Sequence, residues 1–112
     1  MKKLFAHIVF TTLCFSLSAQ VISVKKFYDK DSLHIKESFF VLKSNPSQLD
    51  STYISYYFNG NKKREGKYKK NLAIGDWLFY YESENLKMTG PLVKNLSNGY
   101  WRYYFENGNL KM

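Results

Sequence analysis

The glycines of this chain recur at a fixed spacing of 24 residues, and this constrains its fold more than any other feature. All six lie on three registers of that spacing: Gly60 with Gly108, Gly66 with Gly90, and Gly75 with Gly99. Residues 66–88 align without a gap on residues 90–112, and the identical pairs include Gly66/Gly90, Lys70/Lys94, Asn71/Asn95, Leu72/Leu96, Gly75/Gly99, Trp77/Trp101, Glu82/Glu106, Asn85/Asn109, Leu86/Leu110, Lys87/Lys111 and Met88/Met112. Such a period indicates one supersecondary unit copied along the chain, each copy burying its apolar face against its neighbours.

Each copy opens with an aromatic strand, predicted over residues 53–57, 75–81 and 99–105. Alternation with period two puts every second side chain on one face, which predicts an aromatic ladder. Its members are Tyr53, Ser55, Tyr57, Trp77, Phe79, Tyr81, Trp101, Tyr103 and Phe105. The opposite face carries Tyr56, Tyr80, Tyr100 and Tyr104. These rings either pair across strands within the sheet or stack on a ligand or partner.

Turn signals separate the strands. The sequences at 59–61 and 107–109 are Asn-Gly-Asn, which predicts type I′ turns, and Ser83-Glu84-Asn85 in the middle copy predicts a less tight turn. The second strand of each unit runs through 62–66 or 86–90, and return turns are expected at 71–75 and 95–99. Gly66 and Gly90 are expected to let an aromatic ring lie against bare backbone.

A degenerate copy precedes the regular ones. Residues 27–33 and 37–40 resemble a hairpin that turns at Lys30-Asp31, and residues 43–50, with Pro46, predict a loop longer than its later equivalents. A terminal repeat is expected to depart from consensus. The predicted organisation is a capping repeat over 20–50 and regular repeats over 51–74, 75–98 and, in part, 99–112. The predicted fold class is all-β, an elongated antiparallel β-meander of stacked hairpins.

Residues 1–19 have the features of a secretory signal peptide. Lys2 and Lys3 precede an apolar run from Leu4 to Leu17, and small residues follow at Ser18-Ala19. Cleavage after Ala19 predicts an exported, periplasmic or extracellular protein without cysteine, and lowers the formal charge from +8 to +6. A retained signal anchor is the alternative, and Leu13 before Cys14 disfavours lipid attachment at that cysteine.

The repeat consensus resembles a known family. The pattern Gly-x-Trp-x-Phe/Tyr-Tyr, followed by Asn-Gly and a further Gly, is similar to the MORN repeat (membrane occupation and recognition nexus), in the bacterial form often assigned to YwqK-type antitoxins. The matching residues are Gly75, Trp77, Tyr80, Tyr81, Gly90, Gly99, Trp101, Tyr104 and Gly108. The resemblance covers residues 51–112 well and 27–50 weakly. It implies an elongated sheet that acts as a scaffold or binding module without catalysis, and it suggests an antitoxin-like partner role.

Residues for catalysis are few after the predicted cleavage. The only histidine is His34, expected to be a polar residue facing outward from a strand, and no cysteine remains. Glu82 and Glu106 share a repeat position and are expected to be solvated charges beside the hairpin turns. Asp29-Lys30-Asp31 lacks the other ligands of a calcium loop and predicts a turn. We therefore expect no enzyme activity, cofactor or metal.

A basic run forms the candidate binding patch. It consists of Lys62, Lys63, Arg64, Lys67, Lys69 and Lys70. Such a run either attracts an anionic surface or keeps a strand solvated and free of edge pairing. Lys62 and Arg64 stand where the next copy has Leu86 and Met88, which predicts an open face at the first regular repeat.

Two functions follow as expectations. The first is an exported, non-catalytic module that binds another protein, with a toxin as the candidate partner, by strand addition at residues 110–112. The alternative is a binder of anionic envelope lipid or polysaccharide through residues 62–70, which salt would weaken. Export disfavours nucleic acid as a partner, and the oligomeric state stays open.

Overall fold

A computed structural model describes residues 20–112, so the predicted signal peptide over 1–19 lies outside the described part of the chain. Residues 20–112 contain strands and turns but no helix, as the repeat pattern predicts. The strands are β1 (Val21–Phe27), β2 (Ile35–Leu42), β3 (Asn45–Tyr56), β4 (Lys62–Lys69), β5 (Leu72–Tyr80), β6 (Leu86–Val93), β7 (Leu96–Ser97) and β8 (Arg102–Tyr103).

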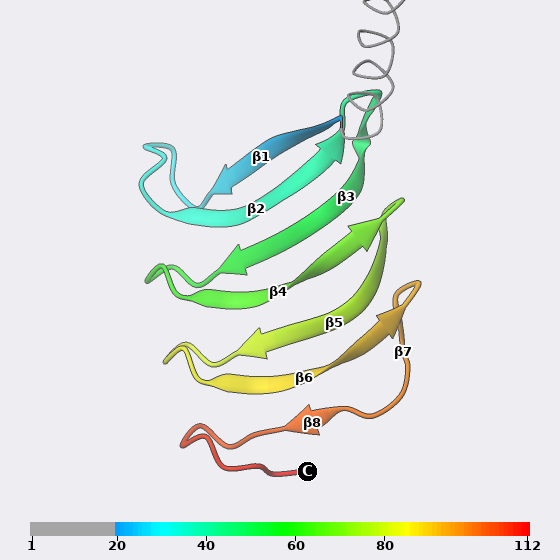
Figure 1. Ribbon diagram of the computed structural model, residues 1–112. Helices are drawn as coiled ribbons and strands as arrows, with labels where there is room; N and C mark the ends of the chain where they lie inside the picture. The colour runs from blue at the N-terminus through cyan, green and yellow to red at the C-terminus, as the bar shows by residue number, and fades with distance from the viewer. Residues whose placement is uncertain (1–19) are drawn as a thin grey trace, which may run out of the picture.

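The strands form one open antiparallel sheet in chain order (Figure 1). Each strand pairs with the next as far as β7, and β8 then pairs with β6 through Met88 opposite Tyr103. This arrangement confirms the predicted β-meander. The final aromatic strand is shorter than expected, since only Arg102 and Tyr103 of residues 99–105 are in β8. An isolated bridge from Tyr104 to Leu110 continues the pairing beyond it.

The type I′ backbone conformation occurs at the return turns between one hairpin and the next, and not at the Asn-Gly sites. Lys70 and Asn71 join β4 to β5 as a two-residue loop, with φ angles of 51° and 68°, and Lys94 with Asn95 repeats this geometry. Positive φ at both central residues defines a type I′ turn, and asparagine tolerates it. The prediction of type I′ turns at 59–61 and 107–109 was therefore wrong in turn type.

Those Asn-Gly sites form three-residue loops. The Tyr57 N–H donates to the Asn61 carbonyl at 2.8 Å, and Gly60 has a φ of 96°. A left-handed residue in third place is typical of a loop that ends in a G1 bulge. The middle copy makes the same loop: the Tyr81 N–H donates to the Asn85 carbonyl, and Glu84 adopts a φ of 83°. The expectation of a less tight turn at 83–85 was wrong.

The prediction of a long loop over residues 43–50 was also wrong. A two-residue turn at Lys43 and Ser44 leads directly into β3, the longest strand, and Pro46 lies within that strand. Irregular register absorbs the extra residues, because Val41 pairs with Leu49 while the next residue, Leu42, pairs with Asn45. The extra residues of the degenerate first copy therefore form β-bulges within β3 and do not lengthen the loop before it.

The core is a ladder of rings on one face of the sheet. The buried apolar residues are Phe39, Val41, Tyr53, Ala73 and Trp77, and Val24, Leu49, Tyr68, Phe79 and Leu92 pack on them half-buried. Ring centroids lie 6.0 Å apart for Tyr53 and Trp77, and 6.2 Å for Phe79 and Trp101. The aromatic ladder is confirmed. Trp77 lies on Gly66 and Trp101 lies on Gly90, so the expectation of rings against bare glycine backbone is confirmed too.

Side chains couple each hairpin to the next at the same repeat positions. The Tyr57 hydroxyl donates to the Tyr80 carbonyl at 2.7 Å, and the Tyr81 hydroxyl to the Tyr104 carbonyl at 2.7 Å. The Tyr28 hydroxyl donates to the Tyr56 carbonyl at 2.6 Å, so the degenerate first hairpin makes the equivalent bond. These bonds satisfy backbone carbonyls and fix neighbouring copies in register.

Candidate functional site

A polar break interrupts the aromatic ladder at one repeat. In the copy that ends at residue 98, Phe79 pairs across the strands with Met88, two apolar side chains on the ladder face. One repeat earlier, the equivalent cross-strand pair is Ser55 with Arg64. The apolar side chains of Phe79 and Met88 thus correspond, one repeat earlier, to the small hydroxyl of Ser55 and the guanidinium of Arg64 on two adjacent strands.

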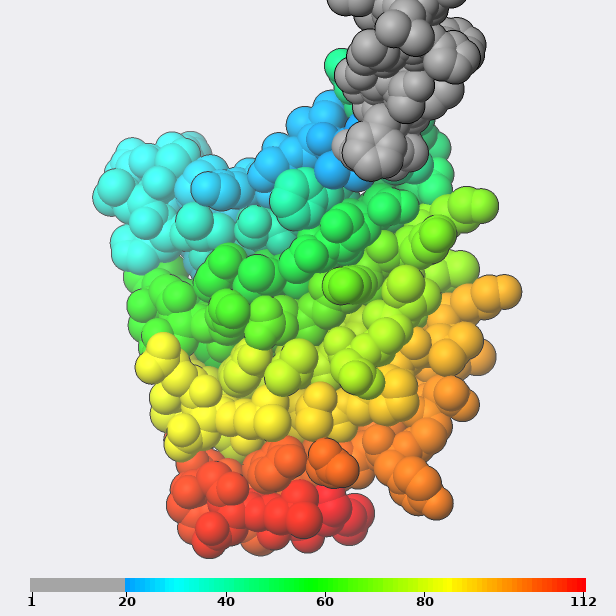
Figure 2. All heavy atoms as spheres, viewed as in Figure 1, coloured from blue at the N-terminus to red at the C-terminus, as the bar shows by residue number. Residues whose placement is uncertain are grey.

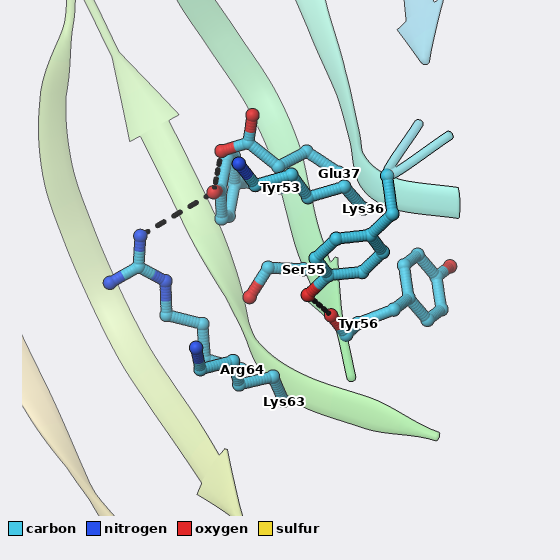
Figure 3. A pocket seen from close by; sticks show the side chains of 8 residues that line it. Lys36, Glu37, Tyr53, Ser55, Tyr56, Lys63 and Arg64 are labelled. Carbon is cyan, nitrogen blue, oxygen red and sulfur yellow. Dashed lines mark hydrogen bonds between the residues drawn. The ribbon is translucent and has the colours of Figure 1, made fainter. Parts of the chain in front are cut away.

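Two further residues complete a polar network around this pair. Tyr53 stands at the repeat position of Trp77 and Trp101, and a tyrosine adds a hydroxyl to the ring. That hydroxyl donates to Glu37 Oε1 on β2 and accepts from Arg64 Nη2 at 3.4 Å, as the dashed lines in Figure 3 mark. The Arg64 guanidinium also lies 5.4 Å from the Tyr53 ring centroid, a cation–π contact.

Ser55 is the buried member of the group. It is only 6 % exposed, and its Oγ has no hydrogen-bond partner within the described residues. Figure 3 shows its hydroxyl on the side of Arg64. Leaving a buried hydroxyl unsatisfied costs about 1–3 kcal/mol, so this position is costly for the fold in the absence of a ligand or water.

A hollow of about 190 Å³ opens over Ser55. Its walls come from β2, β3, β4 and the first hairpin loop, and the lining residues are Tyr28, Lys36, Glu37, Tyr53, Ser55, Tyr56, Lys63 and Arg64. The Lys36 Nζ lies 5.7 Å from the Tyr28 ring centroid, and the Lys63 Nζ lies 5.6 Å from that of Tyr57. Three cations and one carboxylate therefore surround a hydroxyl that has no partner.

Burial and the charges of the network shift two pKa values there. Burial raises the pKa of Tyr53, and the hydrogen bond to Glu37 adds to this, while Arg64 opposes it. Burial alone would lower the pKa of Arg64, but the Tyr53 hydrogen bond and the charges of nearby groups raise it overall. Arg64 is therefore charged and Tyr53 is a neutral phenol at neutral pH. The arrangement suits binding through fixed charges and donors.

The predicted basic patch does not form one surface. All six residues, Lys62, Lys63, Arg64, Lys67, Lys69 and Lys70, are exposed. Arg64 and Lys63 line the hollow on the ladder face, whereas Lys62 pairs with Glu65 at 3.2 Å. Glu65 accepts from the Tyr80 hydroxyl at 2.6 Å on the opposite face, where strand alternation also puts Lys67 and Lys69. The run is split between the two faces.

The end of the sheet from Val93 of β6 onward exposes large apolar side chains. Tyr100 is 96 % exposed and Met112 is 78 % exposed, and the others are Val93, Leu96, Tyr103, Phe105 and Leu110. Figure 2 shows this C-terminal part of the chain forming the end of the molecule opposite β1. Single exposed apolar residues are normal, but a group of this size at one end of a sheet is typical of an interaction site.

Residues 103–112 form the edge of that end. The Tyr103 N–H donates to the Met112 carbonyl at 2.8 Å, and the Lys111 N–H donates to the Tyr103 carbonyl at 2.6 Å. Within residues 20–112, no strand pairs with the outer side of Leu110–Met112. Trp101 Nε1 is buried and has no hydrogen-bond partner among residues 20–112, whereas the equivalent Trp77 Nε1 donates to the Ile74 carbonyl at 3.1 Å.

The repeat-signature residues have structural positions. Gly75 and Gly99 both have a φ of 71°, and Gly108 has a φ of 96°. Ser51 (φ 70°) takes the conformation of Gly75 one copy earlier, so this register of the repeat continues without glycine. Tyr80 binds Glu65, Tyr81 couples to Tyr104, and the two tryptophans lie on glycines. The signature therefore describes the scaffold.

His34 was predicted wrongly as an outward-facing strand residue. It precedes β2, and its Nδ1 lies 2.6 Å from Asp29 Oδ2, while its ring stacks on Phe58 at 4.1 Å. The Asp29 carboxylate also accepts the Leu33 and His34 N–H groups, and the His34 hydrogen bond lowers its pKa. This pair closes the first hairpin loop. Glu82 and Glu106 are exposed beside their turns, as expected.

Within residues 20–112, no group of three His, Cys, Asp or Glu residues could hold a metal ion, and no helix has the length and apolarity to span a membrane. The fold defines the class of molecule as an all-β protein with an open antiparallel sheet of consecutive hairpins. Comparison of the chain with protein-family models, curated proteins and solved structures finds no match. The resemblance to MORN repeats stays a prediction.

Proposed function

We propose that this chain is an exported, non-catalytic repeat module that binds another protein at the end of its sheet. The exposed apolar group on residues 93–112 is the observation that carries this proposal. Leu110–Met112 offers an edge on which a strand of a partner would form main-chain hydrogen bonds, and the apolar side chains would pack against the partner's alternate side chains. β-Augmentation is the binding mode that this surface favours.

An antitoxin-like or immunity-like role fits the same proposal. The MORN-type resemblance suggests it, and the predicted signal peptide puts the partner outside the cytoplasm. The partner would then be a protein that acts in the periplasm or at the cell surface. Neutralisation would consist of covering the partner's own surface, which requires no catalytic residue in this chain.

The test is affinity capture from the native cell envelope with the chain from Gln20 onward, at low and at high salt. We expect one protein to be retained at both salt concentrations, because strand pairing and apolar burial are weakly screened. Leu110→Lys should abolish that retention. The matched control is Leu33→Lys, because Leu33 is 72 % exposed at the opposite end of the sheet. Unchanged capture by Leu110→Lys would contradict the proposal.

A second candidate function is attachment to anionic lipid or polysaccharide. The exposed residues Lys67, Lys69 and Lys70 on and beside β4 favour it. Binding to vesicles that contain anionic lipid should then fall steeply as salt rises, and the triple substitution of these lysines by glutamine should remove it. Capture that survives high salt would reject this candidate as the main function.

A further inference from the structure

We propose that the hollow beside Ser55 binds a small monocarboxylate. Its charge-bearing walls are Lys36, Lys63 and Arg64, and Ser55 supplies a hydroxyl at its base. This site is separate from the C-terminal edge, so the proposal of a ligand here is tested independently of the proposed protein-binding function.

The repeat itself supplies the comparison that carries this inference. The chain can fill this position with apolar side chains, because it does so one copy later with Phe79 and Met88. Here it places Ser55 and Arg64 at the same cross-strand pair, with Tyr53 in place of a tryptophan. The three replacements occur together, on two adjacent strands, and they surround one hollow. Polar groups gathered in this way, around a hydroxyl with no partner, are typical of a ligand site.

The donors match a carboxylate. Arg64 uses one guanidinium nitrogen for the Tyr53 hydroxyl, and its remaining N–H groups are available for the two oxygens of a planar acid. Ser55 would donate its unpaired hydroxyl to the same group. Lys36 and Lys63 add two positive charges at the rim.

Glu37 reduces the positive charge of the hollow. Its carboxylate accepts the Tyr53 hydroxyl and lies in the wall of the hollow. The lining has three cations against this one carboxylate, so its net positive charge attracts an anion. The volume of about 190 Å³ equals that of roughly six water molecules, which limits the bound part to a small acid.

The experiment is an NMR titration of the isotope-labelled chain with sodium propionate, at constant ionic strength against sodium chloride. We expect saturable amide shifts centred on Ser55 and Arg64. Inorganic phosphate is the comparison anion: saturable shifts at the same amides with phosphate, and none with propionate, would reject a carboxylate as the ligand. Shifts that stay linear with concentration, or that appear equally with chloride, would overturn the proposal.

The decisive variant copies the neighbouring repeat. Ser55→Phe combined with Arg64→Met installs the apolar pair of Phe79 and Met88, so the chain should stay folded, with an unfolding midpoint at least as high as the unmodified protein. Propionate binding should fall at least tenfold. Lys87→Gln is the matched control, because Lys87 contacts Tyr81 at the repeat position of Lys63, outside the hollow. Retained binding in the double variant would reject the site.

If the double variant does not fold, Lys63→Gln gives the second measurement. It leaves Ser55 and Arg64 in place, and it should weaken propionate binding about threefold by removing one rim charge. Equal affinity for Lys63→Gln and Lys87→Gln would count against the proposed role of the cationic rim.

Discussion

The indole ring of Trp77 lies directly on the backbone of Gly66, so that a Cβ atom at position 66 would overlap three atoms of the ring. Trp77 is 2 % exposed and is the most buried ring of the core. Gly90 and Trp101 repeat this relationship one copy later. The absence of a side chain at Gly66 therefore allows the Trp77 ring to pack directly on the backbone, and Gly90 does the same for Trp101.

Gly66→Ala should destabilise the fold by at least about 2 kcal/mol, because overpacking against a rigid ring forces the backbone or the indole to move. Urea unfolding followed by tryptophan fluorescence measures this cost. Gly60→Ala is the comparison: nothing lies within 4 Å of a Cβ there, so only its left-handed φ of 96° opposes the change. A larger cost for Gly60→Ala than for Gly66→Ala would contradict the packing explanation.

Glu84→Gly should stabilise the protein by about 0.5–1 kcal/mol. Glu84 holds a φ of 83° in the position that Gly60 and Gly108 occupy in the other copies, and left-handed backbone is costly for a side chain with a Cβ. Thermal unfolding followed by circular dichroism tests this expectation. The reverse change, Gly60→Glu, should lower the midpoint of thermal unfolding. A higher midpoint for Gly60→Glu would show that the left-handed φ does not determine the stability difference.

Tyr81→Phe should cost about 1 kcal/mol, because it removes the hydrogen bond to the Tyr104 carbonyl that joins two copies. Hydrogen exchange should show that amides in residues 101–112 lose protection more than those in β1–β3. Tyr100→Phe serves as the control, since Tyr100 is 96 % exposed, and its stability should stay within about 0.5 kcal/mol of the parent. A uniform loss of protection would speak against local coupling.

Stability should fall as pH rises from about 10 to about 12. Burial, together with the hydrogen bond to Glu65, raises the pKa of Tyr80 to about 12 from its ordinary value of 10.0. The folded state therefore favours the neutral phenol, and its contribution is complete below pH 10 and is lost as pH passes through the folded pKa. Tyr80→Phe should show a shallower decline in unfolding midpoint over this interval. An identical decline in the variant would exclude Tyr80 as its source.

The repeat period made most of the fold predictable. The glycine spacing and aromatic alternation identified the antiparallel meander, the ladder face and the rings on Gly66 and Gly90. Turn types were less predictable, because the Lys-Asn pairs at 70–71 and 94–95 form the type I′ turns while Asn-Gly forms longer loops. Local dipeptide preference is overridden there by the register that flanking strands impose.

The hollow was only half visible in the sequence. The sequence predicts Ser55 on the ladder face and shows Arg64 at the repeat position of Met88, but it does not show that these two residues pair. Their pairing depends on the register of β3 and β4, and Glu37 comes from a degenerate copy that the period does not align. Comparing both strands of each repeat, position by position, would have found the Ser55 and Arg64 pair.

The hydrogen bonds from Tyr28, Tyr57 and Tyr81 have a mechanical consequence. Each crosses only from one hairpin to the adjoining one, and the strands pair only with near neighbours. Tension applied between residues 20 and 112 would therefore peel hairpins away one at a time, giving a series of force steps instead of one abrupt rupture. A chain built in this way yields gradually under load.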